Sequence, residues 1–266
     1  MRVINLRLAT WNINSVRLRI DLVAQLTAEA RPDILCLQET KAADPVFPFD
    51  ALREMGWRHI HAVGMKGFNG VAILSRKPFY HTEVRDWCGR SDARHAIVTL
   101  RGGIEIHNFY VPAGGDVPDP KENDKFAHKL RFLDEVTAWF TNRKHPDNRF
   151  ILMGDLNIAP LKADVWSHKQ LLRAVSHTPI EVERLARLQA SNDWVDAVRK
   201  FTDPDEKLYS WWSYRAHDWN AADKGRRLDH IWVTPRLAPR LKSAQILRHA
   251  RGWERPSDHA PVMINL

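Results

Sequence analysis

The sequence contains little cysteine, with only Cys36 and Cys88 in a chain of 266 residues. Two isolated cysteines form no disulfide framework, and no histidine and cysteine cluster has the spacing of a zinc site. Such usage is typical of a reducing compartment. No apolar run is long enough to cross a membrane, and the N-terminus lacks the apolar core of a signal peptide. We therefore expect a cytoplasmic protein with no membrane partner.

The sequence also lacks internal repeats, low-complexity tracts and flexible linkers. Hydrophobic residues make up 44% and charged residues 27%, which is ordinary for a globular protein. A chain of this length can bury a sizeable core, in one large domain or two small ones. Because no linker divides it, we expect a single domain over residues 1–266.

Charge and tryptophan are plentiful instead. The formal net charge is +8, which favours a polyanionic partner such as nucleic acid, anionic lipid or a phosphorylated small molecule. A solvated basic surface explains the same charge equally well. Eleven tryptophans are many for this length, and exposed ones beside basic residues could stack on bases or sugars. The basic segments 224–227 and 248–251 would suit DNA phosphates.

Apolar runs and amphipathic stripes alternate along the chain. The runs predict strands over 3–12, 33–39, 70–75, 96–100, 104–111, 149–157, 209–214, 228–234, 244–250 and 260–266. Helical spacing predicts helices over 16–29 and 123–143, followed by two or three short ones, of which one begins with Thr178 as its cap. The mixture indicates an α/β domain with layered sheets.

Polar side chains of catalytic type lie at the ends of these strands. They are Asn12, Asn14, Glu39, Tyr110, Asp155, Asn157, Asp229, Asp258 and His259. Each one alone is explained by a turn or a satisfied core polar group, and the stretch "GDLNIAP" from Gly154 is rich in turn formers. Strand ends of a layered α/β fold converge on one edge, however, and acids with amides suit a hard cation and a phosphate. Residues two apart on a strand share a face, so Asp155 and Asn157 can both face such a site.

These residues lie in motifs that resemble a known family. The segments "TWNINSVRLR", "DILCLQETK", "KGFNGVAILS", "YVPAGG", "GDLNIAP", "LDHIWVT" and "PSDHAPV" resemble the motifs of exonuclease III-type apurinic/apyrimidinic (AP) endonucleases. These enzymes belong to the endonuclease/exonuclease/phosphatase superfamily. The resemblance runs from Leu8 to Val262, in family order. It implies an α/β fold, a four-layer sandwich of two packed mixed β-sheets flanked by helices, formed by one catalytic domain.

The resemblance also implies a role for each residue. It gives the catalytic set as Tyr110, Asp155, Asn157, Asp229 and His259. It gives Glu39, Asn14 and Asp258 as metal ligands, Asn12, Lys66, Asn69 and Arg226 as phosphate or DNA contacts, and Trp211 and Leu228 as walls of an abasic-sugar pocket. Asp155 would activate or position the attacking water, while Asp229 would orient His259 toward the phosphate. The implied cofactor is Mg²⁺, with Mn²⁺ as a substitute.

Two positions depart from the family pattern. Ala113 follows "YVP" where an amide is usual, so one phosphate contact is missing or supplied elsewhere. Arg226 stands where an apolar or aromatic wall residue is common. Both changes bear on substrate choice.

Three functions are consistent with these patterns. The first is a monomeric DNA-repair phosphodiesterase that cuts 5′ of abasic sites in double-stranded DNA, with 3′→5′ exonuclease and 3′-end-cleaning action from the same site. The second is a superfamily phosphoesterase that acts on RNA, an inositol phosphate or a lipid head group. The third is a degenerate nucleic-acid-binding module without activity. The segments "ETK" and "SWWSYR" and the positive charge favour the first, and the complete set of acids, amides and histidine disfavours the third.

Overall fold

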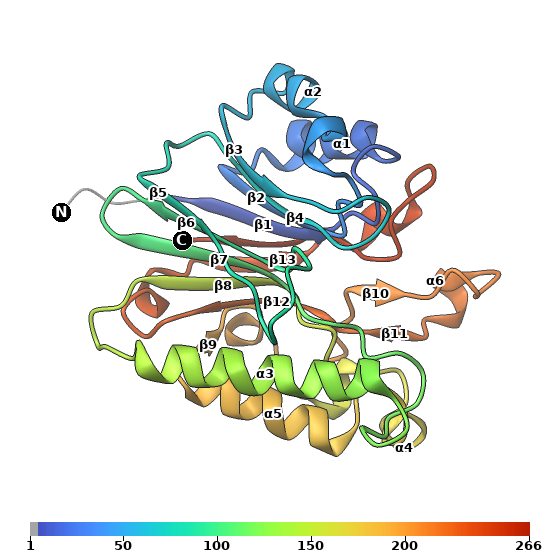
Figure 1. The fold of residues 1–266 in the computed structure, drawn as a ribbon. Helices are drawn as coiled ribbons and strands as arrows, with labels where there is room; N and C mark the ends of the chain where they lie inside the picture. The colour runs from blue at the N-terminus through green and yellow to red at the C-terminus, as the bar shows by residue number, and fades with distance from the viewer. Residues whose placement is uncertain (1–4) are drawn as a thin grey trace.

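A computed structural model describes residues 5–266, in which two sheets pack face to face between outer helices (Figure 1). The helices are α1 (Ile20–Ala30), α2 (Phe49–Glu54), α3 (Asp124–Asn142), α4 (His168–Leu171), α5 (Pro179–Ala190) and α6 (Trp219–Ala222). The strands are β1 (Arg7–Asn12), β2 (Ile34–Gln38), β3 (His59–Val63), β4 (Val71–Ser75), β5 (His81–Val84), β6 (His95–Leu100), β7 (Ile104–Tyr110), β8 (Phe150–Asp155), β9 (Val195–Asp196), β10 (Trp211–Trp212), β11 (Gly225–Arg226), β12 (Asp229–Val233), β13 (Ser243–Ile246) and β14 (Val262–Asn265).

Both large sheets are mixed. One has the strand order β13-β14-β1-β2-β4-β3, and the other has the order β5-β6-β7-β8-β12-β9. The pairs β1–β2 and β7–β8 are parallel, and the remaining pairs are antiparallel. The short strands β10 and β11 form a ribbon beside them (Figure 1). The predicted fold, a sandwich of two mixed sheets flanked by helices, is confirmed.

Strands in both sheets are covered on two faces, as their apolar runs predict. In β2, Ile34 and Cys36 join the core between the sheets, whereas Leu35 and Leu37 face the core under α1 and α2. This alternation follows from the two-residue period of a strand. The layer order is therefore helices, sheet, sheet, helices (Figure 1).

The helix predicted over 123–143 is confirmed as α3, which lies with α5 on the outer face of the second sheet (Figure 1). Asn123 caps it by accepting hydrogen bonds from the backbone N–H groups of Lys125 and Phe126. Its apolar stripe is buried, namely Phe126, Leu130, Leu133, Val136 and Phe140. At the start of α5, the Glu181 carboxylate accepts hydrogen bonds from the N–H and hydroxyl groups of Thr178.

Several predicted boundaries are wrong. The helix predicted over 16–29 begins only at Ile20, because the backbone N–H groups of Ser15 and Val16 donate to the loop after β2. Only Trp211–Trp212 of 209–214 is strand, and β13 ends at Ile246, before a 3₁₀ turn over Arg248–Gly252. Residues 3 and 4 of the predicted first strand lie outside the described residues.

Strands β3 and β5 are not predicted from the sequence. Both are edge strands in which histidine or polar residues break the apolar run. Their side chains are half-buried or exposed, and they carry histidines and polar residues. Edge strands are commonly protected in this way. Over residues 5–266, none of the helices combines the length and apolar character needed to cross a bilayer.

Candidate active site

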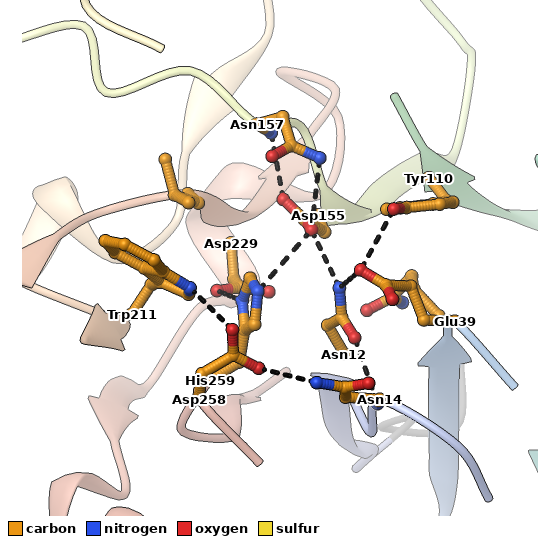
Figure 2. Close-up of polar contacts among 12 residues, drawn as sticks. Asn12, Asn14, Glu39, Tyr110, Asp155, Asn157, Trp211, Asp229, Asp258 and His259 are labelled. Atoms are coloured by element: carbon orange, nitrogen blue, oxygen red, sulfur yellow. Dashed lines mark hydrogen bonds and ion pairs between the residues drawn. The ribbon is translucent and has the colours of Figure 1, made fainter. Parts of the chain in front are cut away.

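The strand ends that carry the predicted residues meet at one edge of the sandwich. Asp155 ends β8, and its Cα is paired with Tyr110 at the end of β7 and with Asp229 at the start of β12. Gly154 permits this close approach, because a Cβ on it would lie 2.0 Å from the carbonyl oxygen of Phe109. Asn12 and Glu39 reach the same edge from the other sheet (Figure 2).

The amide of Asn12 joins the two sheets. Its Nδ2 donates to Glu39 Oε1 and to Asp155 Oδ2, each at 2.9 Å (Figure 2). Its Oδ1 accepts from the backbone N–H of Asn14 at 3.1 Å. Asn12 is fully buried, so both halves of its amide are used inside the protein. The amide therefore fixes the spacing between the two carboxylates.

Asp155 and Asn157 face each other, but not through strand alternation. The strand ends at Asp155, and Asn157 adopts a left-handed backbone with φ of 55°. Its N–H donates to Asp155 Oδ1 at 2.9 Å, while its side chain donates to Asp155 Oδ2 at 3.2 Å and to the carbonyl of Val111 at 2.9 Å. The predicted convergence of the two side chains is thus made by a turn that returns Asn157 toward the acid, and Leu156 is buried in core as expected.

His259 lies between two carboxylates. Its Nδ1 donates to Asp229 Oδ2 at 2.8 Å, and its Nε2 lies 3.7 Å from Asp155 Oδ2 (Figure 2). Ser210 donates its hydroxyl to the same Asp229 oxygen at 2.6 Å. Burial alone would lower the pKa of His259, but the charges of Asp229 and Asp155 raise it to about 10. The imidazole therefore stays protonated at neutral pH.

The pKa of Asp155 moves in the unusual direction for an acid. Burial and the charge of Asp229 raise it, the His259 charge and the Asn12 hydrogen bond oppose the rise, and the net result is a pKa of about 7. A carboxylate in such an environment is a stronger base than an exposed one. The site thus holds a basic carboxylate beside a protonated imidazole.

Glu39 and Asn14 both contact the ammonium group of Lys41. The Lys41 ammonium lies 2.8 Å from Glu39 Oε2 and donates to Asn14 Oδ1 at 2.6 Å. Burial alone would raise the pKa of Glu39, but hydrogen bonds from Asn12 and Lys41 hold it below its usual value. Tyr110 donates its hydroxyl to Glu39 Oε1 at 2.9 Å. Burial and the nearby Glu39 and Asp155 charges raise the pKa of Tyr110 well above its usual range, so the phenol keeps its proton.

Glu39, Asn14 and Asp258 are the three residues predicted as metal ligands, and we refer to them as the oxygen arc. Asp258 lies on the amide-nitrogen side of Asn14. It accepts from Asn14 Nδ2 at 3.1 Å and from Trp211 Nε1 at 2.9 Å (Figure 2). Carboxylate and amide oxygens are the donors that hard divalent cations prefer, so Glu39, Asn14 and Asp258 fit such an ion. Asp155, Asp229 and His259 also offer ligand atoms within 4.8 Å of one another. Because His259 is protonated and bonded to Asp229, the oxygen arc suits a hard cation better.

A cavity of about 340 Å³ opens above these groups. Its walls include Trp211 and Leu228, the two residues predicted to line the sugar pocket. They also include Arg226, which stands where the family commonly has an apolar or aromatic residue. Arg226 donates to the Val175 carbonyl at 3.0 Å and to Ser176 Oγ at 2.8 Å. Its guanidinium lies 5.4 Å from the centre of a Trp211 ring. The side chain is thus held as part of the wall.

The other predicted DNA contacts lie apart from this cavity. Lys66 is exposed in the loop between β3 and β4. Asn69 accepts from Arg94 at 3.2 Å and donates to the Asp92 carbonyl at 2.9 Å. It lines a neighbouring groove that shares Tyr110 and Ala113 with the cavity. Ala113, which stands where the family pattern has an amide, lines both the cavity and the groove.

Sequence reasoning missed four polar residues of the site. They are Lys41, Lys129, Glu181 and Ser210. Lys129 is fully buried under the loop of Asn157. Its place three residues after Phe126 and four before Leu133 sets it on the apolar face of α3, and this spacing is the signal that could have found it. Glu181 carried a signal, because it follows Thr178 at the spacing of a capping box. Ser210 stands beside Trp211 in the segment "SWWSYR", which favours a DNA-repair function in the sequence but gives the serine itself no role.

Comparisons with known proteins agree with this geometry. The model of the Endonuclease/Exonuclease/phosphatase family matches residues 9–259. The chain is 29% identical to exodeoxyribonuclease III of Haemophilus influenzae, over 97% of this chain and 98% of that protein. An AP endonuclease structure from Archaeoglobus fulgidus superposes with a TM-score of 0.91 at 31% identity, covering 97% of this chain and 98% of that one. The 3′ phosphatase NExo from Neisseria, bound to a product DNA hairpin, gives 0.88 at 31% identity with the same coverage.

Proposed function

Because the chain belongs to the Endonuclease/Exonuclease/phosphatase family, we propose that it is a Mg²⁺-dependent DNA-repair nuclease, with Mn²⁺ as a substitute. It cuts the phosphodiester on the 5′ side of abasic sites in double-stranded DNA and removes blocking groups or nucleotides from 3′ ends. The observation that carries the proposal is the buried array in which Asn12, Asp155, His259 and Asp229 bond one another beneath a cavity. The related nucleases and the DNA-bound 3′ phosphatase support it.

The basic and acidic groups of the array divide the work. Asp155 accepts a proton from the water that attacks phosphorus, as a carboxyl with a pKa of about 7 can do near neutral pH. Asn157 and Asn12 hold that carboxylate in place by three hydrogen bonds to its two oxygens.

His259 donates its Nε2 proton toward a non-bridging phosphate oxygen, while Asp229 holds the ring from the other side. Glu39, Asn14 and Asp258 would hold the divalent cation, which when bound neutralises charge on the phosphate. The Tyr110 phenol, which keeps its proton, is a neutral donor at the edge of the cavity. Since the residues named here all come from one chain, we propose that residues 1–266 act as a single catalytic domain and as a monomer in the cytoplasm.

The test uses a duplex oligonucleotide with one tetrahydrofuran abasic analogue. Wild-type protein with Mg²⁺ should release a 3′-hydroxyl and a 5′ sugar phosphate, and EDTA should abolish cleavage. Asp155→Asn keeps the size of the side chain but removes the base, so turnover should fall by about 10²–10⁴-fold. Thermal melting and DNA affinity of Asp155→Asn serve as controls and should stay close to wild type.

Other substrates separate the competing functions. A single-stranded RNA, an inositol phosphate and a 3′-phosphate duplex are assayed beside the abasic duplex. Faster turnover of RNA or inositol phosphate would contradict a DNA-repair role. Absence of metal-dependent turnover on every substrate would leave a binding module without activity.

A further inference from the structure

A buried ion pair lies beneath the candidate active site and has no part in the chemistry proposed above. Lys129 on α3 and Glu181 on α5 are both fully buried, and their charged groups are 2.5 Å apart. Burial lowers the pKa of Lys129, and the Glu181 charge opposes this shift. Burying two charges carries a desolvation penalty of several kcal/mol per ion, roughly, so such a pair is weak evidence of a stabilising role.

The contacts of Lys129 point toward the active-site loops. Its ammonium donates to the backbone carbonyl of Asn157 at 2.8 Å and to that of Ala113 at 3.3 Å. Asn157 is the residue with the left-handed backbone whose amide groups hold Asp155. Gly114 lets the lysine approach, because a Cβ there would lie 3.0 Å from the Lys129 side chain.

The contacts of Glu181 reach the opposite wall. Its carboxylate accepts the backbone N–H of Ser176, at 3.0 Å to each oxygen, and the N–H and hydroxyl of Thr178. Ser176 lines the cavity, and its Oγ accepts a hydrogen bond from Arg226 at 2.8 Å. One ion pair therefore ties together the loops after β7 and β8 and the wall formed by 174–178.

We propose that Lys129 and Glu181 are positioning residues, which hold Asn157 in its left-handed conformation and the cavity wall at a fixed distance from Asp155. The expected effect on turnover rests on the proposed function, whereas the expected effect on the conformation of the loops does not. Misplacing a reacting group by about 1 Å can cost roughly 10²-fold in rate. Neither residue touches the substrate, so the effect is on kcat.

The test variant is Lys129→Met with Glu181→Gln, which removes both charges and leaves neither unpaired. The matched control is Arg143→Met, at the other end of α3. It breaks an ion pair in which Arg143 Nη1 lies 2.7 Å from Glu105 Oε1. We expect kcat of the double variant on the abasic duplex to fall about 10²-fold, with KM within a few-fold of wild type. The control should lose some thermal stability and keep its kcat.

Two further measurements separate positioning from stability. Amide hydrogen exchange of Asn157, whose N–H is bonded to Asp155, should accelerate in the double variant and not in the control. In an Asn157→Ala background, adding Lys129→Met together with Glu181→Gln should lower kcat little further, because the ion pair acts through that residue. If the double variant does not fold, Lys129→Arg, which keeps both charges but moves the donor groups, is measured in the same way.

Unchanged kcat, unchanged exchange at Asn157, or equal losses in the double variant and the control would each overturn the positioning role. A wild-type protein without metal-dependent cleavage would instead refute the proposed function. The exchange experiment would then still decide whether the ion pair holds the loop.

Discussion

At the scale of single residues, Asp229 acts on the cavity only through His259. Its Oδ2 accepts hydrogen bonds from Ser210 and His259, and its Oδ1 is buried without a hydrogen-bond partner. The positive imidazole is therefore the main compensation for the charge of Asp229. Removing either partner leaves the other buried without its counter-charge, so the two side chains form one unit.

This unit predicts strongly non-additive losses. Asp229→Asn and His259→Asn should each lower kcat on the abasic duplex, and the double variant should be little worse than His259→Asn alone. The exposed side of the site offers a control in Asp223→Asn, an acid bonded to Trp212 and Arg248 outside the cavity, which should keep near-normal kcat. Losses that simply multiply would mean that the pair does not work as a unit. Single-turnover kinetics of wild type and these four variants provides the comparison.

At the scale of elements, the basic segment 224–227 divides into residues with different tasks. Arg227 is buried and bonds Asp164 and Asp196, while Arg226 is bonded to the cavity wall. Lys224 remains exposed. Lys224 and Lys66 are therefore the exposed lysines predicted to contact DNA, and Arg226 stays a predicted contact at the cavity wall.

Each lysine that contacts a phosphate contributes to the salt dependence of DNA binding. Lys224→Ala and Lys66→Ala should each reduce the slope of log K against log salt by about one. Arg227→Met should leave the slope unchanged and instead lower the free energy of unfolding by about 3–5 kcal/mol, since it breaks a buried pair. Fluorescence anisotropy with intact duplex over a salt series measures the slope, and urea unfolding measures the stability. An unchanged slope in both lysine variants would place the DNA elsewhere.

Elements also decide what the sequence can predict. Apolar runs that are covered on both faces, such as β2 and β8, are predicted well, because their pattern is local. The motifs at their ends led to the acids, amides and histidine that the structure brings together (Figure 2). The start of α1 and the role of Lys129 could not be predicted in this way. Lys129 contacts Asn157 and Glu181 at separations of 28 and 52 residues, so its task exists only once α3 and α5 have packed.

At the scale of the whole molecule, the sandwich buries several histidines in neutral form. Burial and the charges of His107, Arg85 and Arg143 hold the pKa of His95 well below its usual value. Burial lowers the pKa of His107 against the opposing charge of Glu105. For His230, burial and the charge of Arg227 lower the pKa to about 4, and its Nε2 lies 2.8 Å from the carbonyl of Ile158.

These imidazoles make the protein sensitive to acid. Below a pH of about 6.5 the unfolded chain protonates these histidines more readily than the folded protein does, and the folded protein protonates His230 only near pH 4, so each of them lowers the free energy of unfolding as pH falls. Asp155 acts in the opposite sense, because its raised pKa lets the folded state bind a proton first as pH falls through 7. His259 also acts in that sense near neutral pH, because its pKa of about 10 keeps it protonated in the folded state, but below a pH of about 6 it is charged in both states and its contribution no longer changes. Between pH 6 and pH 5, His230 therefore contributes a loss of stability as pH falls.

His230→Gln tests this balance, because glutamine can still donate to the Ile158 carbonyl but does not titrate. Urea unfolding of wild type between pH 6 and pH 5 should show a falling free energy of unfolding. In His230→Gln the slope should be smaller by up to about 1.4 kcal/mol per pH unit, the contribution of one titrating group. His145→Gln, at an exposed position, serves as the control and should keep the wild-type slope. Equal slopes in all three proteins would mean that His230 is protonated in the folded state, and that the sandwich tolerates a charged imidazole between β12 and the loop that carries Asn157.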